Sequence, residues 1–233
     1  MGSCRASPLL VLGIDTATWT AAVGVVSDGA PLAEVSAPAT RGHAASLPAL
    51  VEQALARAKR RLEDVEAVAV SIGPGSFTGL RIGLALAKGI VFAGGLKLAT
   101  VPTLEALAHA APVAPGAIVC AALDARKQEV YAALFDVTEA GRRRLTPDAV
   151  LSPARLLERL PTGCVLVGDA AATYPQLGAR ARVLALDLCP PRGVVVARLG
   201  WARLAAGEEA SPGETEPVYV RPSEAEINRS GSR

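Results

Sequence analysis

An aspartate and two threonines follow the first strand-like run of the chain. Leu9 to Ile14 is apolar and of strand length, and it ends in Asp15-Thr16-Ala17-Thr18. A carboxylate in such a turn can hold a metal ion or a water molecule, and hydroxyl groups can hydrogen-bond a phosphate. Asp15, Thr16 and Thr18 are therefore candidate nucleotide-binding residues.

A second strand-like run, residues 117–123, also ends in an aspartate, Asp124. Its turn, 124–129, is long and charged and contains no glycine, so its backbone cannot easily approach a phosphate. This difference between the two turns disfavours a two-sided ATP clamp. We expect Asp124, Arg126 and Glu129 to form a charged structural cluster instead.

A glycine-rich turn links a strand predicted over 65–72 to a helix predicted to about residue 92. Gly73, Pro74 and Gly75 interrupt the apolar run, and Ser76 or Thr78 can cap the helix. The segment resembles a phosphate cradle, but it lacks the GxxxxGK[ST] and GxGxxG spacings. The helix is apolar on all sides, so it is either a central core helix or a helix whose free face a partner chain covers.

An amphipathic helix is predicted over 44–62, with Ser46 as its cap, Pro48 in its first turn and the basic run 59–61 in its last. We expect the helices at 44–62 and 79–92 to form a partner surface together, because their small residues permit close helix packing. The residues predicted to form this interface are Ala45, Ala49, Leu50, Gly79, Leu80, Gly83, Leu84 and Ala87.

Catalytic and metal-binding signatures are missing from the sequence. The two histidines, His43 and His109, stand far apart, there is no HExxH, and the four cysteines form no CxxC pair. We therefore predict no catalytic residue, no metal site and no intrinsic cofactor. The net charge of +2 gives no independent case for nucleic-acid binding. No apolar run is long enough to span a membrane. The cysteine pattern indicates a reducing, cytoplasmic compartment.

The element order occurs twice along the chain. The first copy begins with strands at 9–14, 20–26 and 32–36, with a hairpin turn at 28–29, and continues with the helix at 44–62. After the glycine-rich segment it ends with a strand at 96–101 and a helix at 103–110. The pattern restarts with strands at 117–123, 130–137 and 149–151, a charged turn at 141–144, helices at 152–160 and 194–206, and a strand at 164–167. This predicts an α/β protein of two duplicated β-β-β-α-β-α subdomains, at 9–110 and 117–222, with tails at 1–8 and 223–233.

Several of these segments resemble the bacterial TsaB (YeaZ) family. They are Gly13-Ile-Asp-Thr-Ala-Thr18, His43 with Leu47-Pro48, Gly73-Pro-Gly-Ser-Phe-Thr-Gly-Leu-Arg-Ile-Gly83, Asp124-Ala-Arg with Glu129-Val-Tyr131, and Pro217-Val-Tyr-Val-Arg221. The resemblance runs from about residue 9 to 226 and implies an actin-like ATPase (ASKHA) fold.

The resemblance also implies a function: a part in making N6-threonylcarbamoyladenosine at position 37 of tRNAs that decode ANN codons. Members are non-catalytic scaffolds of the transferase TsaD, joined by the ATPase TsaE. We accordingly expect contact with tRNA only through the complex, and ATP or ADP at the complex interface. The apolar helix face could also serve a homodimer of the isolated chain, whose oligomeric state the sequence does not give. Two alternatives stay open: a small-molecule kinase or ATPase of the same fold, suggested by the turn at Asp15, and a glycoprotease-like peptidase.

Overall fold

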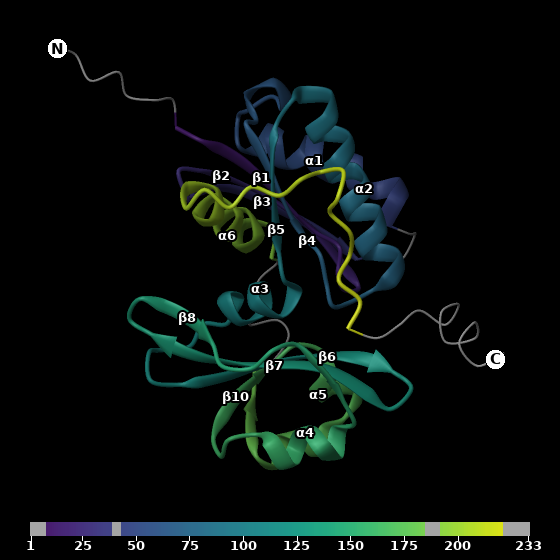
Figure 1. Cartoon of the computed structure of the whole chain (residues 1–233), viewed down its shortest axis with the longest axis vertical. Coiled ribbons are helices and arrows are strands. Elements are labelled where there is room, and N and C mark those ends of the chain that lie inside the picture. The colour runs from purple at the N-terminus through teal and green to yellow at the C-terminus, as the bar shows by residue number, and fades with distance from the viewer. Residues whose placement is uncertain (1–7, 39–42, 185–191, 221–233) are drawn as a thin grey trace. The chain divides into compact units, whose positions relative to one another are not determined.

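The structure is a computed structural model that describes residues 8–38, 43–184 and 192–220, and the side chains of all of these except 43–45. The chain forms two compact units (Figure 1). Of the described residues, the first unit contains 8–38, 43–72, 76–101 and 192–216, and the second contains 73–75, 102–184 and 217–220.

The first unit is built on a five-stranded mixed sheet in the order β3-β2-β1-β4-β5. β1, β2 and β3 pair antiparallel, while β4 pairs parallel with β1 and with β5. The elements of this unit are β1 (Leu10–Asp15), β2 (Thr20–Ser27), β3 (Ala30–Pro38), α1 (His43–Arg57), η1 (Leu62–Asp64), β4 (Ala67–Ser71), α2 (Phe77–Gly94), β5 (Lys97–Val101) and α6 (Gly193–Ala205).

The second unit repeats this plan with the strand order β11-β10-β6-β7-β8, and β9 pairs with β7 beside β8. Its elements are α3 (Thr103–Ala110), β6 (Ile118–Arg126), β7 (Glu129–Thr138), β8 (Gly141–Arg144), β9 (Ala149–Leu151), α4 (Pro153–Arg159), β10 (Cys164–Val167), α5 (Ala170–Thr173), η2 (Pro175–Ala179) and β11 (Ala181–Val183). Both halves of the chain thus run β-β-β-α-β-α around a mixed sheet, which confirms the predicted actin-like α/β architecture.

The compact units exchange one helix each relative to the predicted ranges 9–110 and 117–222. Helix α3 belongs to the second unit, because Leu104 and Leu107 pack in one core with Phe135. Helix α6 belongs to the first unit, where it packs on β1, β2 and β4. A helix belongs to the unit whose sheet buries its apolar face, and the order of elements in the sequence does not determine which sheet that is. The tails lie outside the described residues, apart from residue 8.

Two further predicted elements differ from those observed. The segment 141–144 is a strand, β8, rather than a turn, because Arg143 pairs with Asp136 of β7 and the Arg144 guanidinium stacks on the Phe135 ring. Such charged residues on an edge strand hinder pairing with other chains. Helix α1 begins at His43 and ends at Arg57, so Ser46 and Pro48 lie inside it and the basic run 59–61 lies beyond it. Lys59 has a left-handed φ of 53°, which a continuing helix does not allow.

Helix α2 begins as predicted, since the Ser76 hydroxyl accepts a hydrogen bond from Gly79 N at 3.2 Å. Within the described residues α2 is the one helix that is long and apolar enough to cross a membrane. Its inner face, which includes Leu80, Leu84 and Val91, is buried on the sheet of the first unit. The helix is largely a core helix, as its glycine-rich, apolar sequence allows.

The sheet of the first unit is covered on both faces, and the two faces are covered differently. Large side chains such as Leu12, Ile14 and Val70 pack against α1 and α2. The alternate residues face α6 and are small: a methyl group on Gly13 would lie 2.2 Å from Gly193 O, and one on Gly24 would lie 2.1 Å from Val194 N. Helix α6 therefore approaches this sheet backbone to backbone.

We predict that Gly24→Ala destabilises the protein by at least about 2 kcal/mol, because the added methyl group overlaps the backbone of α6. Gly89→Ala is the matched control: nothing lies within 4 Å of the added carbon, and removing a helical glycine should stabilise the fold by up to about 1 kcal/mol. Urea denaturation of both variants measures this. Equal stability of Gly24→Ala and the wild type would contradict the close docking of α6.

Candidate functional site

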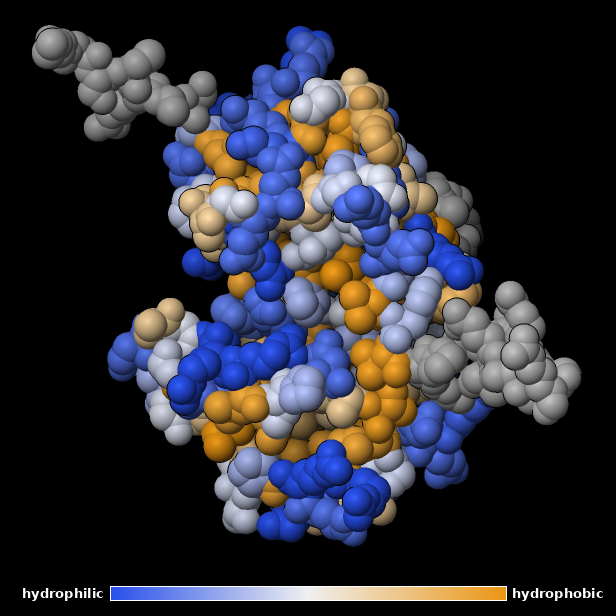
Figure 2. All heavy atoms as spheres, viewed as in Figure 1, coloured by the Kyte–Doolittle hydropathy of each residue, from blue (hydrophilic) through white to orange (hydrophobic). Residues whose placement is uncertain are grey.

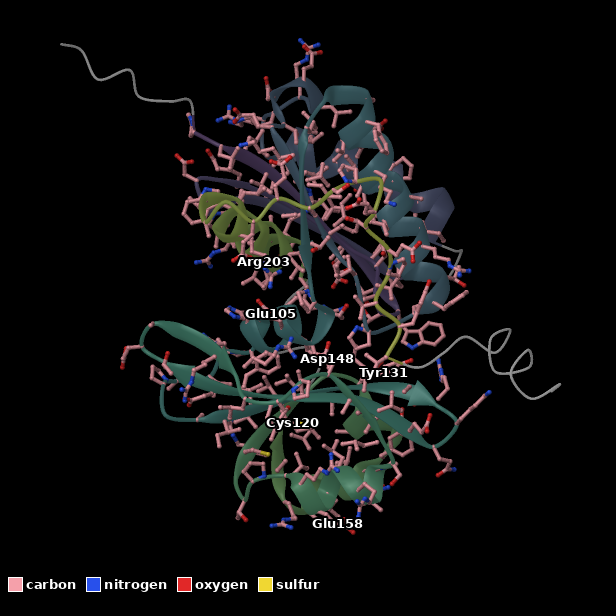
Figure 3. All side chains as sticks on the ribbon, viewed as in Figure 1. Glu105, Cys120, Tyr131, Asp148, Glu158 and Arg203 are labelled. Atoms are coloured by element: carbon pink, nitrogen blue, oxygen red, sulfur yellow. The ribbon has the colours of Figure 1, made fainter. Side chains whose placement is uncertain are left out.

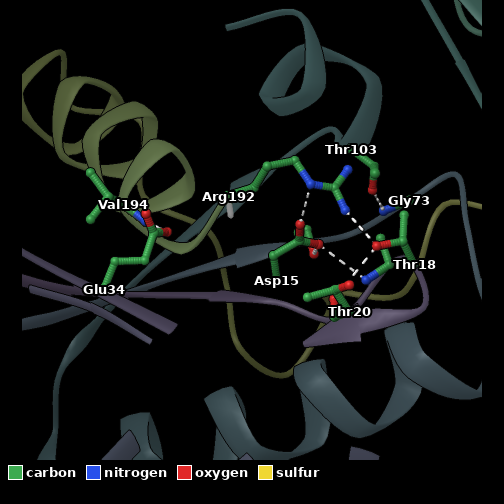
Figure 4. Close-up of polar contacts among 10 residues, drawn as sticks. Asp15, Thr18, Thr20, Glu34, Gly73, Thr103, Arg192 and Val194 are labelled. Atoms are coloured by element: carbon green, nitrogen blue, oxygen red, sulfur yellow. Dashed lines mark hydrogen bonds and ion pairs between the residues drawn. The ribbon is translucent and has the colours of Figure 1, made fainter. Parts of the chain in front are cut away.

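The candidate site lies where β1 ends, in the first unit (Figure 4). Asp15 is 1% exposed, and its Oδ1 accepts hydrogen bonds from the Ser71 hydroxyl at 2.7 Å and from Ala17 N at 3.0 Å. Ser71 is the last residue of β4, which lies parallel to β1, so the two strands end side by side and deliver both groups to one point. Asp15 is therefore a rigidly held, buried carboxylate.

The positive charge that balances Asp15 comes from Arg192. Arg192 Nε lies 2.7 Å from Asp15 Oδ2, and the two side chains are 8% and 1% exposed. Arg192 Nη2 donates to the Thr18 hydroxyl at 2.8 Å, so one guanidinium joins the turn after β1 to the start of α6 (Figure 4). The cation that a free carboxylate would attract is thus supplied by the chain itself.

Thr16 is also committed to the fold. Its side chain is buried, and its hydroxyl donates to the carbonyl oxygen of Gly79 in α2 at 2.7 Å. A methyl group on Gly83, one turn later, would lie 2.2 Å from the same hydroxyl oxygen. The turn after β1 and the start of α2 are in direct contact, since Ser76 N donates to Ala17 O at 2.8 Å. The glycines of α2 permit this approach.

Asp15, Thr16 and Thr18, the candidate nucleotide-binding residues, therefore each have a protein partner. Sequence reasoning missed Arg192, which lies 174 residues from Thr18. One signal was present: Arg192 stands at the N-terminal end of a helix, where the helix dipole disfavours a cation. A cation at that position implies a nearby anion, which here is Asp15.

The start of α6 holds a second carboxylate. Glu34 Oε1, from β3, accepts from Val194 N at 2.8 Å. Burial raises the pKa of Glu34, and the nearby charge of Asp15 raises it further. Hydrogen bonds from the N–H groups of Val194 and Gly193 lower the same pKa, but by less than burial raises it. The N–H groups at this helix end are thus already engaged by the protein. Arg192 Nη1 is a buried donor that makes no hydrogen bond within the described part of the chain, and the contact of Asp15 Oδ2 is its ion pair with Arg192 Nε.

The second strand-end aspartate, Asp124, lies in the second unit and is likewise bound by its own unit. Its Oδ1 accepts from Arg126 N at 2.9 Å and from the Tyr174 hydroxyl at 3.3 Å, and Arg126 Nη1 lies 3.2 Å from Oδ2. Burial and then the Asp124 charge raise the pKa of Tyr174. The predicted contact between Asp124 and Arg126 is present, and Glu129 lies opposite Arg126 in the hairpin.

This hairpin has an unusual backbone. Arg126, Lys127 and Gln128 all have left-handed φ values, of 64°, 52° and 63°. Residues other than glycine adopt that conformation at a cost, so neighbouring contacts must hold it. The Asp124 carboxylate does so by binding both the backbone and the side chain of Arg126. The lack of glycine therefore did not prevent a tight left-handed turn.

The predicted partner interface needs correction. Six of its eight residues are buried within the first unit and cannot form a surface: Leu50, Gly79, Leu80, Gly83, Leu84 and Ala87. They are buried because the inner faces of α1 and α2 pack on the sheet and on Thr16. Ala49 is exposed, and the side chain of Ala45 lies outside the described residues.

No group of three or more histidine, cysteine, aspartate or glutamate side chains that could hold a metal ion occurs within the described ranges.

Comparison with known proteins identifies the family. The model of "TsaD: tRNA N6-adenosine threonylcarbamoyltransferase" matches residues 35–184. The Escherichia coli tRNA threonylcarbamoyladenosine biosynthesis protein TsaB is 33% identical over 218 residues, which cover 91% of this chain and 94% of that protein. A tRNA N6-adenosine threonylcarbamoyltransferase of Thermus thermophilus is 34% identical over 150 residues, which cover 58% of this chain and 46% of that protein. The structure called YeaZ from Pseudomonas aeruginosa superposes with a TM-score of 0.78 at 29% identity, over 91% of this chain and 99% of that one.

We predict that Arg192→Gln destabilises the fold by about 3–5 kcal/mol, because it leaves the Asp15 charge buried without a partner. Asp15→Asn should cost a similar amount, and the double variant should cost less than the sum of the two. A double-mutant cycle by chemical denaturation measures this coupling. Additive losses would show that the two charges do not depend on each other.

With near-complete coverage by the biosynthesis proteins, a matching transferase model and the same fold as YeaZ, the chain belongs to the TsaB (YeaZ) family of tRNA threonylcarbamoyladenosine biosynthesis proteins.

Proposed function

We propose that this protein is a non-catalytic subunit that binds and activates the transferase TsaD in the complex that modifies adenosine 37 of ANN-decoding tRNAs. In this proposal TsaE and ATP or ADP join at the complex interface, tRNA is contacted through the complex, and the assembly works in the cytoplasm. Two observations support the proposal: the ion pair between Asp15 and Arg192 at the turn after β1, and the exposed small and apolar residues on the outer faces of α1 and α2.

The observation that carries the non-catalytic role is the ion pair between Arg192 and Asp15. A kinase or ATPase of this fold needs the carboxylate after its first strand to act on a metal ion or a water molecule. Here a guanidinium lies 2.7 Å from that carboxylate, and a threonine hydroxyl that could meet a phosphate accepts from the same guanidinium. The kinase alternative would require this buried pair to separate.

The partner surface we propose is the outward face of α1 and α2, which we define by Ala49, Ala56, Ala85, Gly89 and Phe92. All five are exposed, and Phe92 is 67% exposed. Half-buried apolar side chains on α2, including Ile82, Leu86 and Ile90, adjoin them. The two helices pack against each other in the first unit, so their outer faces adjoin. Exposed Glu52, Gln53 and Arg81 border the small and apolar residues of this surface.

The similarity to the Thermus transferase indicates which partner suits this surface. The family model of the transferase covers residues 35–184, which include α1 and α2. Two related chains can pair equivalent helices about an approximate two-fold axis, as in a symmetric dimer. The same surface would then serve a homodimer when TsaD is absent.

We predict that the isolated protein neither transfers threonylcarbamoyl groups nor hydrolyses ATP above background. Asp15 is neutralised by Arg192, so no charged group is left at this turn to position a metal ion. Purified protein assayed with ATP and Mg²⁺ tests this. Turnover by the pure chain that is absent from an Asp15→Asn variant shown to be folded would favour the kinase alternative.

We also predict that Ala85→Arg and Ala49→Arg each weaken binding to TsaD at least about 100-fold, since the interface would desolvate an unpaired charge. Both residues are exposed, so the fold should persist. Ala154→Arg, on the exposed side of α4 in the second unit, is the matched control and should bind normally. Titration calorimetry with TsaD and light scattering measure this. Wild-type affinity in both helix variants would rule out this surface.

A further inference from the structure

A pocket of about 180 Å³ lies wholly within the second unit, between the sheet and helix α4. Side chains of β6, β7, β9 and α4 and the link between β8 and β9 line it. Apolar or small residues form most of its wall: Cys120, Ala132, Ala133, Leu134, Pro147, Ala149, Leu151 and Leu156. Thr146 and Arg159 supply its polar groups. No part of this pocket belongs to the strand-end turns described above.

The pocket exists because the strand beside β7 is broken. β8 ends at Arg144 and β9 begins at Ala149, and both pair with β7. Between them the chain bulges: Leu145 N and Thr146 N both donate to Leu134 O, at 2.8 and 3.4 Å. Ala132, Ala133 and Ala149 of the neighbouring strands have side chains too short to fill the space that the bulge opens.

Both polar groups at the pocket are donors. The Thr146 hydroxyl oxygen accepts from Leu134 N at 2.9 Å, which leaves its proton for another acceptor. Arg159 is exposed to solvent and makes no hydrogen bond or ion pair with the described residues. Glu158 pairs with Arg155, and Asp148 pairs with Arg144. Glu158 points outward from α4 in Figure 3, and hydrophilic residues cover the outer side of that helix in Figure 2.

The rest of the wall offers no competing charge. Cys120 of strand β6, labelled in Figure 3, lines the pocket, and burial raises the pKa of its thiol, so it stays neutral. No carboxylate side chain of the described residues lines the pocket. A cation and a hydroxyl donor at an apolar pocket complement a ligand with an apolar body and one anionic group.

We propose that this pocket binds a small monocarboxylate whose body is the size of one six-membered ring or a short branched chain. An apolar cavity of about 150 Å³ accommodates benzene, so the volume here suits such a body. The carboxylate faces Arg159 and the Thr146 hydroxyl, and the apolar body lies against Ala132, Ala149 and Leu156. This site is independent of the surface proposed for TsaD.

The test uses the full chain with 4-fluorobenzoate, observed by ¹⁹F NMR. We expect saturable binding, and at least about tenfold weaker binding of the neutral isostere 4-fluorobenzamide, because the amide loses a charge-assisted hydrogen bond. Arg159→Gln should weaken benzoate binding by a similar factor. Arg182→Gln removes another exposed cation of the same unit, one that does not line the pocket, and should leave binding unchanged.

A second pair of variants tests the apolar body. Ala149→Leu fills the pocket and should abolish binding, whereas Ala154→Leu adds the same atoms on the exposed side of α4 and should not. If Ala149→Leu does not fold, Leu151→Phe fills the pocket from the same strand. Absence of saturable benzoate binding overturns the proposal. So does binding that persists unchanged in Arg159→Gln or in a folded pocket-filling variant.

Discussion

The buried ion pair between Asp15 and Arg192 joins the first strand of the chain to its last described helix. Each charge has lost nearly all its water, so each depends on the other and on the hydroxyl groups of Ser71 and Thr18. The pair forms only because α6 lies directly on the sheet, which Gly13 and Gly24 allow. Those glycines offer little hydrophobic area, so the ion pair and the Glu34 contact supply the specificity of this docking.

The same pair occupies the polar side chains of the turn after β1. The side chains that such a turn would offer to a metal ion and a phosphate are Asp15, Thr16 and Thr18, and all three interact within the first unit. Asp124 is held in the same manner by Arg126 and Tyr174 within the second unit. Each strand-end aspartate therefore fixes a turn within its own unit.

The sequence predicted the elements and their duplicated order well, because alternating and continuous apolar runs identify strands that are half or fully buried. The sequence did not predict which face of a helix is buried where the apolar pattern is the same on all faces. Helix α2 is apolar all round, so its periodicity cannot tell Gly83, which faces Thr16, from Ala85, which faces solvent. Arg192 could not be placed either, since its partner lies far away in sequence. Tertiary packing likewise places α3 in the second unit and α6 in the first, and the local sequence does not encode that choice.

The scarcity of large side chains has opposite effects in the two units. Aromatic residues make up 3% of the chain, so its layers are built mainly from alanine, glycine, valine and leucine. Where backbones can approach, as at Gly24 and Val194, small residues give close contact and no space is left. Where the break between β8 and β9 holds the chain away from β7, the same small residues leave a pocket at Ala132 and Ala149. In a chain of this composition, backbone geometry decides whether two elements pack closely or leave a pocket between them. In the second unit, Arg159 supplies the positive charge at the pocket that remains.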